Sequence, residues 1–463
     1  MRLMKRDMSR SAGAVLLVAW GALGCGSAPG HAAGGAGGAD ASSAGGGTAG
    51  ASGGAGGHPD AGLPIDMAAA GDDGGAESGA AGARPDSSSA DALDAASEAG
   101  DARDAATSPA WTGTWASSPQ SCGGAFGGQT IRAIVHTSIG GSAARVRLSN
   151  AFGSGPLQVR DVHIAERTTG STIDPATDEA LTFDGQSSVT VAAGAYAVSD
   201  AAAFVVKPLS DVAVSFFVVS HGGVTCHQSG FQTNYQATGD VAGDKTLSGT
   251  TNGSYFFLSN LDVQSPSAEG AVVTLGASIT DGYSSRGDVN RRWPNDLAVR
   301  VGMAGRAVGV LNQGISGDGV ANAVSRFDRD VLSQPNVKWV IFSDNPINDL
   351  GNFNPPAQTE IDQVKTMIAK AHAHGIKFLC STLTPFQGAG YWSAQKETGR
   401  AAINAFIRGS NSGCDGIVDQ DTATHDPANP TVYLPAFNSG DNLHPNEAGL
   451  QAIANAVDLS LLH

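Results

Sequence analysis

Aromatic side chains are missing from a long stretch near the start of the chain. Residues 26–109 contain no Phe, Trp or Tyr, but they hold 21 of the 63 glycines and 12 acidic side chains against two basic ones. Such a stretch buries too little apolar surface to offset the entropy of ordering, so we expect residues 25–109 to form a disordered tether. The formal net charge of the whole chain is −16, which excludes a nucleic-acid binder that works through bulk positive charge.

The chain also lacks an apolar run long enough to span a bilayer comfortably. Its apolar segment 14–23 is short and follows four basic residues, as in a secretory signal. The next residues, Ala-Leu-Gly-Cys, resemble the lipobox of bacterial lipoproteins, in which the cysteine becomes the lipidated first residue. We therefore expect a lipoprotein signal at residues 1–24, export, and a lipid anchor at Cys25 as the only contact with a membrane. Cleavage as a simple signal peptide, followed by secretion, is the alternative.

Cysteine is scarce, with five residues in the chain. Apart from Cys25 these are Cys122, Cys226, Cys380 and Cys414, and export would allow them to form disulfides. Four cysteines allow three connectivities, of which pairing within each predicted domain, Cys122 with Cys226 and Cys380 with Cys414, is the simplest. No Cys-x-x-Cys pair or Cys/His cluster indicates a metal site, so we expect no metal.

Two different patterns of apolar and polar residues follow the predicted tether. Residues 110–265 contain short runs of alternating polar and apolar residues, such as 145–148 and 188–191, separated by glycines. This pattern predicts an antiparallel β domain, most simply a sandwich. In residues 266–463, continuously apolar runs alternate with segments of helical spacing, which predicts a parallel sheet covered on both faces. The predicted strands are 271–275, 307–311, 337–343, 376–382 and 416–419, and the predicted helices include 320–331, 361–371 and 450–461.

Polar residues follow these strands at their carboxyl ends, where the sites of parallel sheets lie. Ser278 begins a helix after the first strand, so it is a candidate nucleophile or a simple helix cap. Gly314 and Asn348 follow later strands and could donate N–H groups to an oxyanion, or form a plain turn and a cap. Asp441 and His444, ahead of the last helix, could form an acid–base pair or an unremarkable surface pair.

Two other patterns in the sequence could also indicate catalytic residues. Ser393 and Lys396 match the Ser-x-x-Lys of penicillin-binding enzymes, but no partner motif accompanies them, so we expect Ser393 to cap a helix. His425, beside Asp426, is the second candidate for a catalytic base.

The four loops read GASITDG, NQGISG, PINDLG and DNLHPNEAG. Together they resemble the sequence blocks of the SGNH hydrolases, also called GDSL esterases, and the β region resembles the N-terminal part of a secreted bacterial subgroup. The resemblance implies a flavodoxin-like three-layer α/β domain at 266–463, preceded by the β-sandwich-like domain at 110–265. It implies Ser278 as nucleophile and His444 as general base oriented by Asp441. The implied oxyanion hole consists of the N–H groups of Ser278 and Gly314 and the side chain of Asn348.

Two positions depart from the family pattern. Ala277 stands where the family usually has Asp, and Asn345-Pro346 replaces a glycine that usually precedes Asn348. Because proline fixes φ and removes a backbone donor, the orientation of the Asn348 side chain could differ from that in the family.

The prediction is a serine esterase that uses no metal or organic cofactor and has an ester as its partner, with no nucleic acid involved. The resemblance favours acyl groups on carbohydrates as the substrate. A lysophospholipid or a simple acyl ester is the alternative among enzymes. The alternative from another class is a polysaccharide-binding protein whose catalysis is impaired by Asn345-Pro346.

Overall fold

The computed structural model of the chain describes residues 110–463. The predicted signal segment at 1–24, the lipidation site at Cys25 and the tether at 25–109 lie outside the described residues. Among residues 110–463, no helix combines the length and the apolar character needed to cross a membrane.

The first part of the described chain is antiparallel β structure in three sheets. The four-stranded sheet has the order β1 (Trp111–Ala116), β15 (Leu258–Gln264), β4 (Ala143–Ser149) and β9 (Tyr196–Val198). The eight-stranded sheet runs β13 (Thr250–Asn252), β12 (Asn234–Thr238), β3 (Gln129–His136), β10 (Asp211–Ser220), β5 (Leu157–Thr169) and β6 (Thr172–Ile173), with β7 (Glu179–Leu181) and β8 (Ser188–Val191) also paired to β5. The three-stranded sheet contains β14 (Tyr255–Phe256), β11 (Val224–His227) and β2 (Gln120–Cys122).

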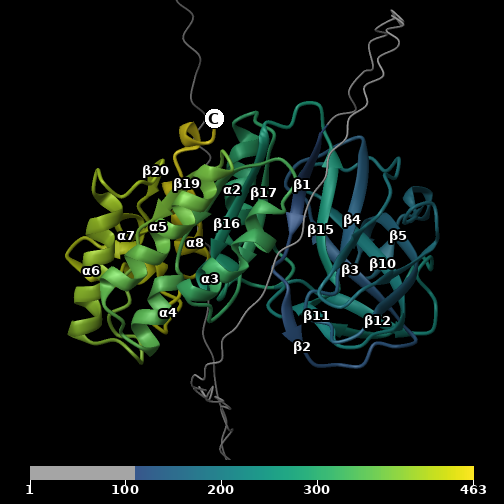
Figure 1. Cartoon of the computed structure of the whole chain (residues 1–463), viewed down its shortest axis with the longest axis horizontal. Helices are drawn as coiled ribbons and strands as arrows, with labels where there is room; N and C mark the ends of the chain where they lie inside the picture. Colours follow the sequence, from purple (N-terminus) through teal and green to yellow (C-terminus); the bar gives the residue numbers. More distant parts are fainter. Residues whose placement is uncertain (1–109) are drawn as a thin grey trace, which may run out of the picture. The chain divides into compact units, whose positions relative to one another are not determined.

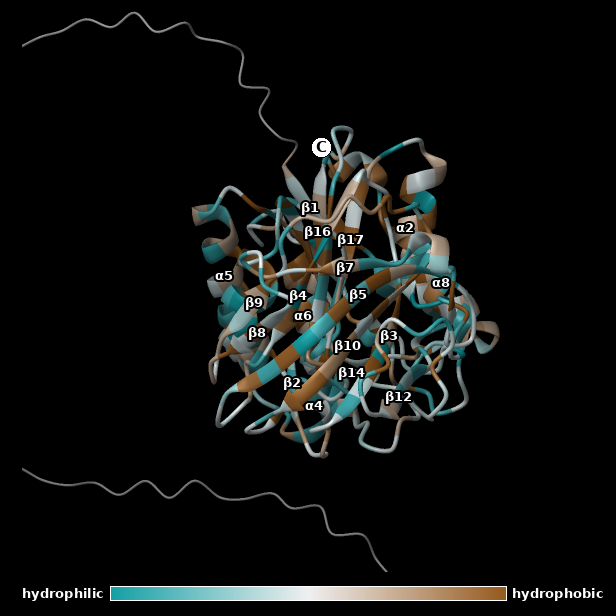
Figure 2. Ribbon diagram, turned by 90° about the vertical axis from the view of Figure 1, so that its right-hand side faces the viewer, coloured by the Kyte–Doolittle hydropathy of each residue, from teal (hydrophilic) through white to brown (hydrophobic). Residues whose placement is uncertain are grey.

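The two larger sheets share one hydrophobic core. Val146 and Leu261 from the four-stranded sheet belong to the same buried cluster as Val159 and Val214 from the eight-stranded sheet. Strand β5 alternates between buried and exposed residues along its first half, and Figure 2 shows this as alternating hydrophobic and hydrophilic segments. This period of two buries one face of the strand. The expected sandwich of two packed sheets is therefore present in this region.

The second part is built on a parallel sheet of five strands. The order is β17 (Val308–Gly314), β16 (Gly270–Gly276), β18 (Val337–Phe342), β19 (Lys377–Ser381) and β20 (Gly416–Val418). All seven residues of β16 are buried, which requires cover on both faces of the sheet. All five strands predicted from the sequence are confirmed, with ends that differ by a few residues at most.

Helices connect these strands and cover the sheet (Figure 1). In chain order they are α1 (Ser278–Asp281), α2 (Trp293–Met303), α3 (Val320–Phe327), α4 (Asn345–Asn352), α5 (Ala357–Ala373), α6 (Ala394–Arg408), α7 (Gln420–Thr424) and α8 (Glu447–Ala456). A short antiparallel pair, β21 (His425–Asp426) and β22 (Asn429–Tyr433), follows α7.

Two of the predicted helices end earlier than their spacing suggested. Helix α3 stops at Phe327 and continues as a π-helical turn, Asp328–Leu332. Helix α8 stops at Ala456, because Val457 adopts an extended conformation, and a 3₁₀ turn at Leu459–Leu461 follows. The apolar residues of both segments are buried in the core or packed against it, so the spacing predicted the apolar face correctly but not the type of helix.

The β region and the α/β region meet where strand β1 lies beside β17 (Figure 1). Two glycines allow this approach, since a Cβ atom added to Gly309 would lie 2.0 Å from the carbonyl oxygen of Gly113. Hydrogen bonds also cross the junction here. Gly113 N donates to the carbonyl of Pro335 at 3.4 Å, and Val310 N donates to Ser138 Oγ at 3.0 Å.

Both disulfides expected within the two regions are formed. Cys122 on β2 pairs with Cys226 on β11, and Cys380 on β19 pairs with Cys414 just ahead of β20. The second bridge joins the ends of two neighbouring strands of the parallel sheet and closes a loop with a sequence separation of 34 residues.

Removing the second bridge should lower the free energy of unfolding. Cross-linking a loop of this length restricts the unfolded chain and contributes about 4 kcal/mol. We expect the double variant Cys380→Ala, Cys414→Ala to lose about that much in denaturant unfolding, with the slope of the transition as a check on the unfolded state. Equal stability of the variant and the native protein under oxidising conditions would contradict this expectation.

Candidate active site

Three of the predicted side chains meet beyond the carboxyl end of strand β16. Ser278 is the first residue of α1, and its Oγ lies 2.8 Å from His444 Nε2. His444 Nδ1 lies 2.6 Å from Asp441 Oδ2. Because a carboxylate only accepts, Nδ1 carries the proton, and Nε2 faces the serine hydroxyl as an acceptor. This arrangement can remove the hydroxyl proton as the serine attacks an electrophile.

The loop that precedes α8 holds Asp441 in place. One carboxylate oxygen, Oδ1, accepts from the backbone N–H groups of Leu443 at 2.9 Å and of His444 at 2.8 Å, and from Ser439 Oγ at 2.9 Å. Partial burial acts to raise the pKa of Asp441, but the hydrogen bonds from His444 and Leu443 outweigh it and lower the pKa to about 2. Asp441 therefore stays charged at any pH at which the protein would work, and it fixes the orientation of the imidazole.

A second carboxylate, which sequence reasoning missed, holds the turn that carries Ser278. Asp344 is 3% exposed and ends the loop after β18. Its two oxygens accept from Ala277 N at 3.1 Å and from Ile279 N at 2.8 Å. The amide between them, that of Ser278, has no acceptor among residues 110–463 and is the first N–H of a helix. It is therefore free to bind a developing negative charge.

The structure corrects one predicted oxyanion donor. Gly314 N donates to Asn312 Oδ1 at 2.9 Å, so this amide is already used. A Cβ atom at Gly314 would lie 2.3 Å from Asp281 N, which means that this glycine lets β17 pack closely against α1. The glycine after the strand is therefore required for close packing, and it does not supply a free donor.

Gly317, three residues further along, fits the donor role better and was not singled out from the sequence. It is exposed, it has a φ of +82°, and its N–H has no acceptor within the described part of the chain. Asn348 is tied to the same loop, because its Nδ2 donates to the carbonyl of Asp318 at 3.0 Å. One hydrogen of the Asn348 amide group remains for a ligand.

Pro346 is accommodated in the helix that carries Asn348. It lies in the first turn of α4, where backbone N–H groups have no intrahelical partner and proline is tolerated. The preceding residue, Asn345, is fully buried and its Nδ2 lies 3.3 Å from both the carbonyl of Gly319 and Asp318 Oδ2. The proline therefore does not break the helix, which begins normally and is tied to the loop of Gly317 through Asn345 and Asn348.

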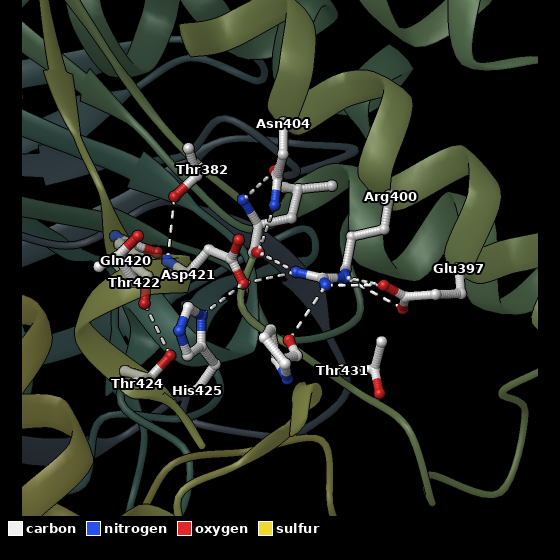
Figure 3. Close-up of polar contacts among 12 residues, drawn as sticks. Thr382, Glu397, Arg400, Asn404, Gln420, Asp421, Thr422, Thr424, His425 and Thr431 are labelled. Carbon is white, nitrogen blue, oxygen red and sulfur yellow. Dashed lines mark hydrogen bonds and ion pairs between the residues drawn. The ribbon is translucent and has the colours of Figure 1, made fainter. Parts of the chain in front are cut away.

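The remaining candidates lie elsewhere. His425 faces Asp421, with Nδ1 and Oδ1 3.6 Å apart, in a cluster of polar side chains around Arg400 (Figure 3). It does not contact Ser278, whose partner is His444. Ser393 caps α6 as expected, accepting from Lys396 N at 3.3 Å. No group of three or more His, Cys, Asp or Glu side chains within residues 110–463 is arranged to hold a metal.

A pair of acidic side chains supports the helix that carries Asn348. Asp349 accepts from Val320 N at 2.7 Å and so joins α4 to the start of α3. Glu360 on α5 is 3% exposed and lies near Asp349. Burial, together with the charge of Asp349, raises the pKa of Glu360 to about 8. The folded protein therefore keeps Glu360 protonated at neutral pH.

This raised pKa predicts a loss of stability as the pH rises. In the unfolded chain Glu360 ionises near pH 4.3, whereas in the folded chain it holds its proton to about pH 8, so stability falls between these values. We expect Glu360→Gln to gain about 1–3 kcal/mol relative to the native protein between pH 5 and pH 8 in denaturant unfolding. The exposed Asp362 on the same helix provides the control, Asp362→Asn. A stability difference for Glu360→Gln that does not change with pH would refute this account.

Comparison with known proteins agrees with this geometry. Residues 274–452 match the model of the GDSL-like Lipase/Acylhydrolase family. No curated protein matches the chain. Among solved structures, a lipase/acylhydrolase from Enterococcus faecalis is 20% identical, with 40% of this chain and 92% of that chain covered and a TM-score of 0.34. A GDSL-like lipase from Bacteroides thetaiotaomicron is 19% identical, with 42% and 88% covered and a TM-score of 0.32. An acetyl xylan esterase from Geobacillus stearothermophilus is 20% identical, with 42% and 95% covered and a TM-score of 0.34. The match identifies residues 274–452, within the α/β region, as a GDSL-like lipase/acylhydrolase domain.

Proposed function

We propose that the protein hydrolyses carboxylic esters through an acyl-enzyme on Ser278. The hydroxyl of Ser278 attacks the ester carbonyl carbon while His444 Nε2 takes its proton. The resulting oxyanion is bound by the N–H groups of Ser278 and Gly317 and by Asn348 Nδ2. When the tetrahedral intermediate collapses, the bond to the alcohol breaks and His444 returns the proton to the leaving oxygen. Water, deprotonated by His444, then releases the acid and restores Ser278.

The observation that carries this proposal is the chain of contacts from Ser278 Oγ through His444 to Asp441, at 2.8 Å and 2.6 Å. The alternative of a binding protein with impaired catalysis rested on Asn345-Pro346. Because α4 begins normally at these residues, that reason no longer applies.

Substitutions in the triad should abolish hydrolysis of 4-nitrophenyl acetate. We expect Ser278→Ala and His444→Ala to lower kcat by roughly 10³-fold or more, as in other serine hydrolases. Asp441→Asn should have a comparable effect, because an amide group can donate to Nδ1 and so favour the wrong tautomer of His444.

His425→Ala is the matched control, since His425 also lies near a carboxylate but does not contact Ser278. It should leave kcat within a few-fold of the native value. Equal rates for the native protein and Ser278→Ala would overturn the esterase proposal.

For the substrate, we propose an acyl group on a carbohydrate. Tyr283 is 47% exposed and packs against the catalytic histidine, with ring centroids 4.3 Å apart. An exposed aromatic ring beside the base offers a flat apolar face to a sugar ring. Such a ring beside the base favours a sugar ligand over an acyl chain of a lipid.

A panel of acetylated xylan, acetylated pectin and lysophosphatidylcholine tests this choice. We expect acetate release from at least one acetylated polysaccharide with a higher kcat/KM than fatty-acid release from lysophosphatidylcholine. Tyr283→Ala should raise the KM for the polysaccharide several-fold while changing the KM for 4-nitrophenyl acetate little, because only the larger substrate reaches the ring. Preferred hydrolysis of lysophosphatidylcholine would support the lipid alternative instead.

A further inference from the structure

A histidine of the β region reaches the helix that carries the nucleophile. His227 ends strand β11, and its Nε2 lies 3.0 Å from Oδ1 of Asp281, the last residue of α1. The other ring nitrogen, Nδ1, lies 3.0 Å from the carbonyl oxygen of Ser118 and must donate to it, because a carbonyl only accepts. The two side chains are 4% and 1% exposed. Buried polar side chains of this kind are retained only with their hydrogen bonds satisfied.

Asp281 also accepts hydrogen bonds from the loop that contains Gly317, a proposed oxyanion donor. Its second oxygen, Oδ2, accepts from the backbone N–H of Ser316 at 3.0 Å and from the Ser316 hydroxyl at 2.7 Å. Ser316 directly precedes Gly317, whose free N–H is a proposed oxyanion donor. The position of that N–H therefore depends on Asp281, and the orientation of the Asp281 carboxylate depends on His227.

Ser118 of the β region reaches the other side of the same loop. Its Oγ accepts from Arg326 Nη1 at 3.0 Å, and Arg326 is 5% exposed. From the same guanidinium, Nη2 donates to the carbonyl of Gly276 at 3.0 Å and Nε donates to Asp318 Oδ2 at 2.8 Å. Arg326 thus touches the strand end before the nucleophile and the residue that follows Gly317.

The three-stranded sheet brings these two β-region residues to the junction. His227 follows Cys226 on β11, and Ser118 lies just before β2, which pairs with β11. The Cys122–Cys226 disulfide ties the same two strands together. The contacts to the catalytic loops therefore come from a part of the β region that is covalently fastened.

We propose that the β region completes the active site, with His227 as a positioning residue that holds Asp281, and through it the Ser316–Gly317 loop, in the geometry needed for ester hydrolysis. This inference rests on the proposed esterase function. It gives the β region a role in catalysis that packing between the regions or polysaccharide binding alone would not require.

Removing the imidazole should lower turnover more than substrate binding. We expect His227→Ala to reduce kcat for 4-nitrophenyl acetate about 10- to 100-fold, because a small displacement of an oxyanion donor has an effect of this size. The KM should change less than threefold. His227→Gln keeps a donor that can reach Asp281 and should recover part of kcat, which a loss of packing alone would not predict.

The matched control is His163→Ala. His163 also contacts a carboxylate, with Nδ1 3.0 Å from Asp178 Oδ2, but both residues belong to the β region and neither lies at the catalytic loops. This variant should keep kcat within twofold. Thermal unfolding of each variant identifies any loss of folded protein, and rates are compared per folded molecule.

A double-mutant cycle with Ser316→Ala tests the route through Asp281. If His227 acts through Asp281 on Ser316, the losses in kcat of the two single variants should not multiply in the double variant. If His227→Ala does not fold, His227→Gln and Ser316→Ala serve in its place, and a kcat equal to the native value in both would overturn the inference. A folded His227→Ala with native kcat would also overturn it, while the esterase function would stand on the separate loss of activity in Ser278→Ala.

Discussion

The catalytic loops are held by carboxylates that are buried at the end of the parallel sheet and must be hydrogen-bonded in full. Asp344 binds the amides on either side of Ser278, and Asp281 binds the amide and hydroxyl of Ser316. Asp318 accepts from Arg326 and, through its carbonyl, from Asn348. A buried carboxylate that loses such partners is costly, so each one fixes the backbone that it bonds. The free N–H groups of Ser278 and Gly317 lie between these fixed points.

These contacts bring residues of both the α/β region and the β region to the proposed site. From the β region, His227 contacts one oxygen of Asp281, and Ser118 adds a further acceptor for Arg326. His444, the proposed base, is held differently, by Asp441 from its own loop. The nucleophile and the oxyanion donors are therefore supported from two regions, whereas the base is supported locally.

Much of the α/β region could be predicted from the sequence, because continuously apolar runs report strands that are buried on both faces. Ser278, Asp441 and His444 could be found because each lies in a loop after such a strand or before the last helix. The choice between Gly314 and Gly317 could not be made, since it depends on where the side chain of Asn312 turns. The roles of Asp344 and His227 depend on contacts across 65 and 54 residues of sequence, and no local pattern marks them. The proline at 346 misled because its effect depends on its place in the first turn of α4.

Among the many serines in the chain, we propose that His444 and Asp441 activate Ser278 alone. A fluorophosphonate probe reacts only with a serine whose proton can be removed and whose oxyanion is stabilised, so labelling followed by peptide mass spectrometry tests the claim directly. We expect a single adduct, on the peptide that contains Ser278, and no adduct in the folded His444→Ala variant. An unlabelled Ser278 in the folded native protein, or an adduct on a different serine, would contradict it.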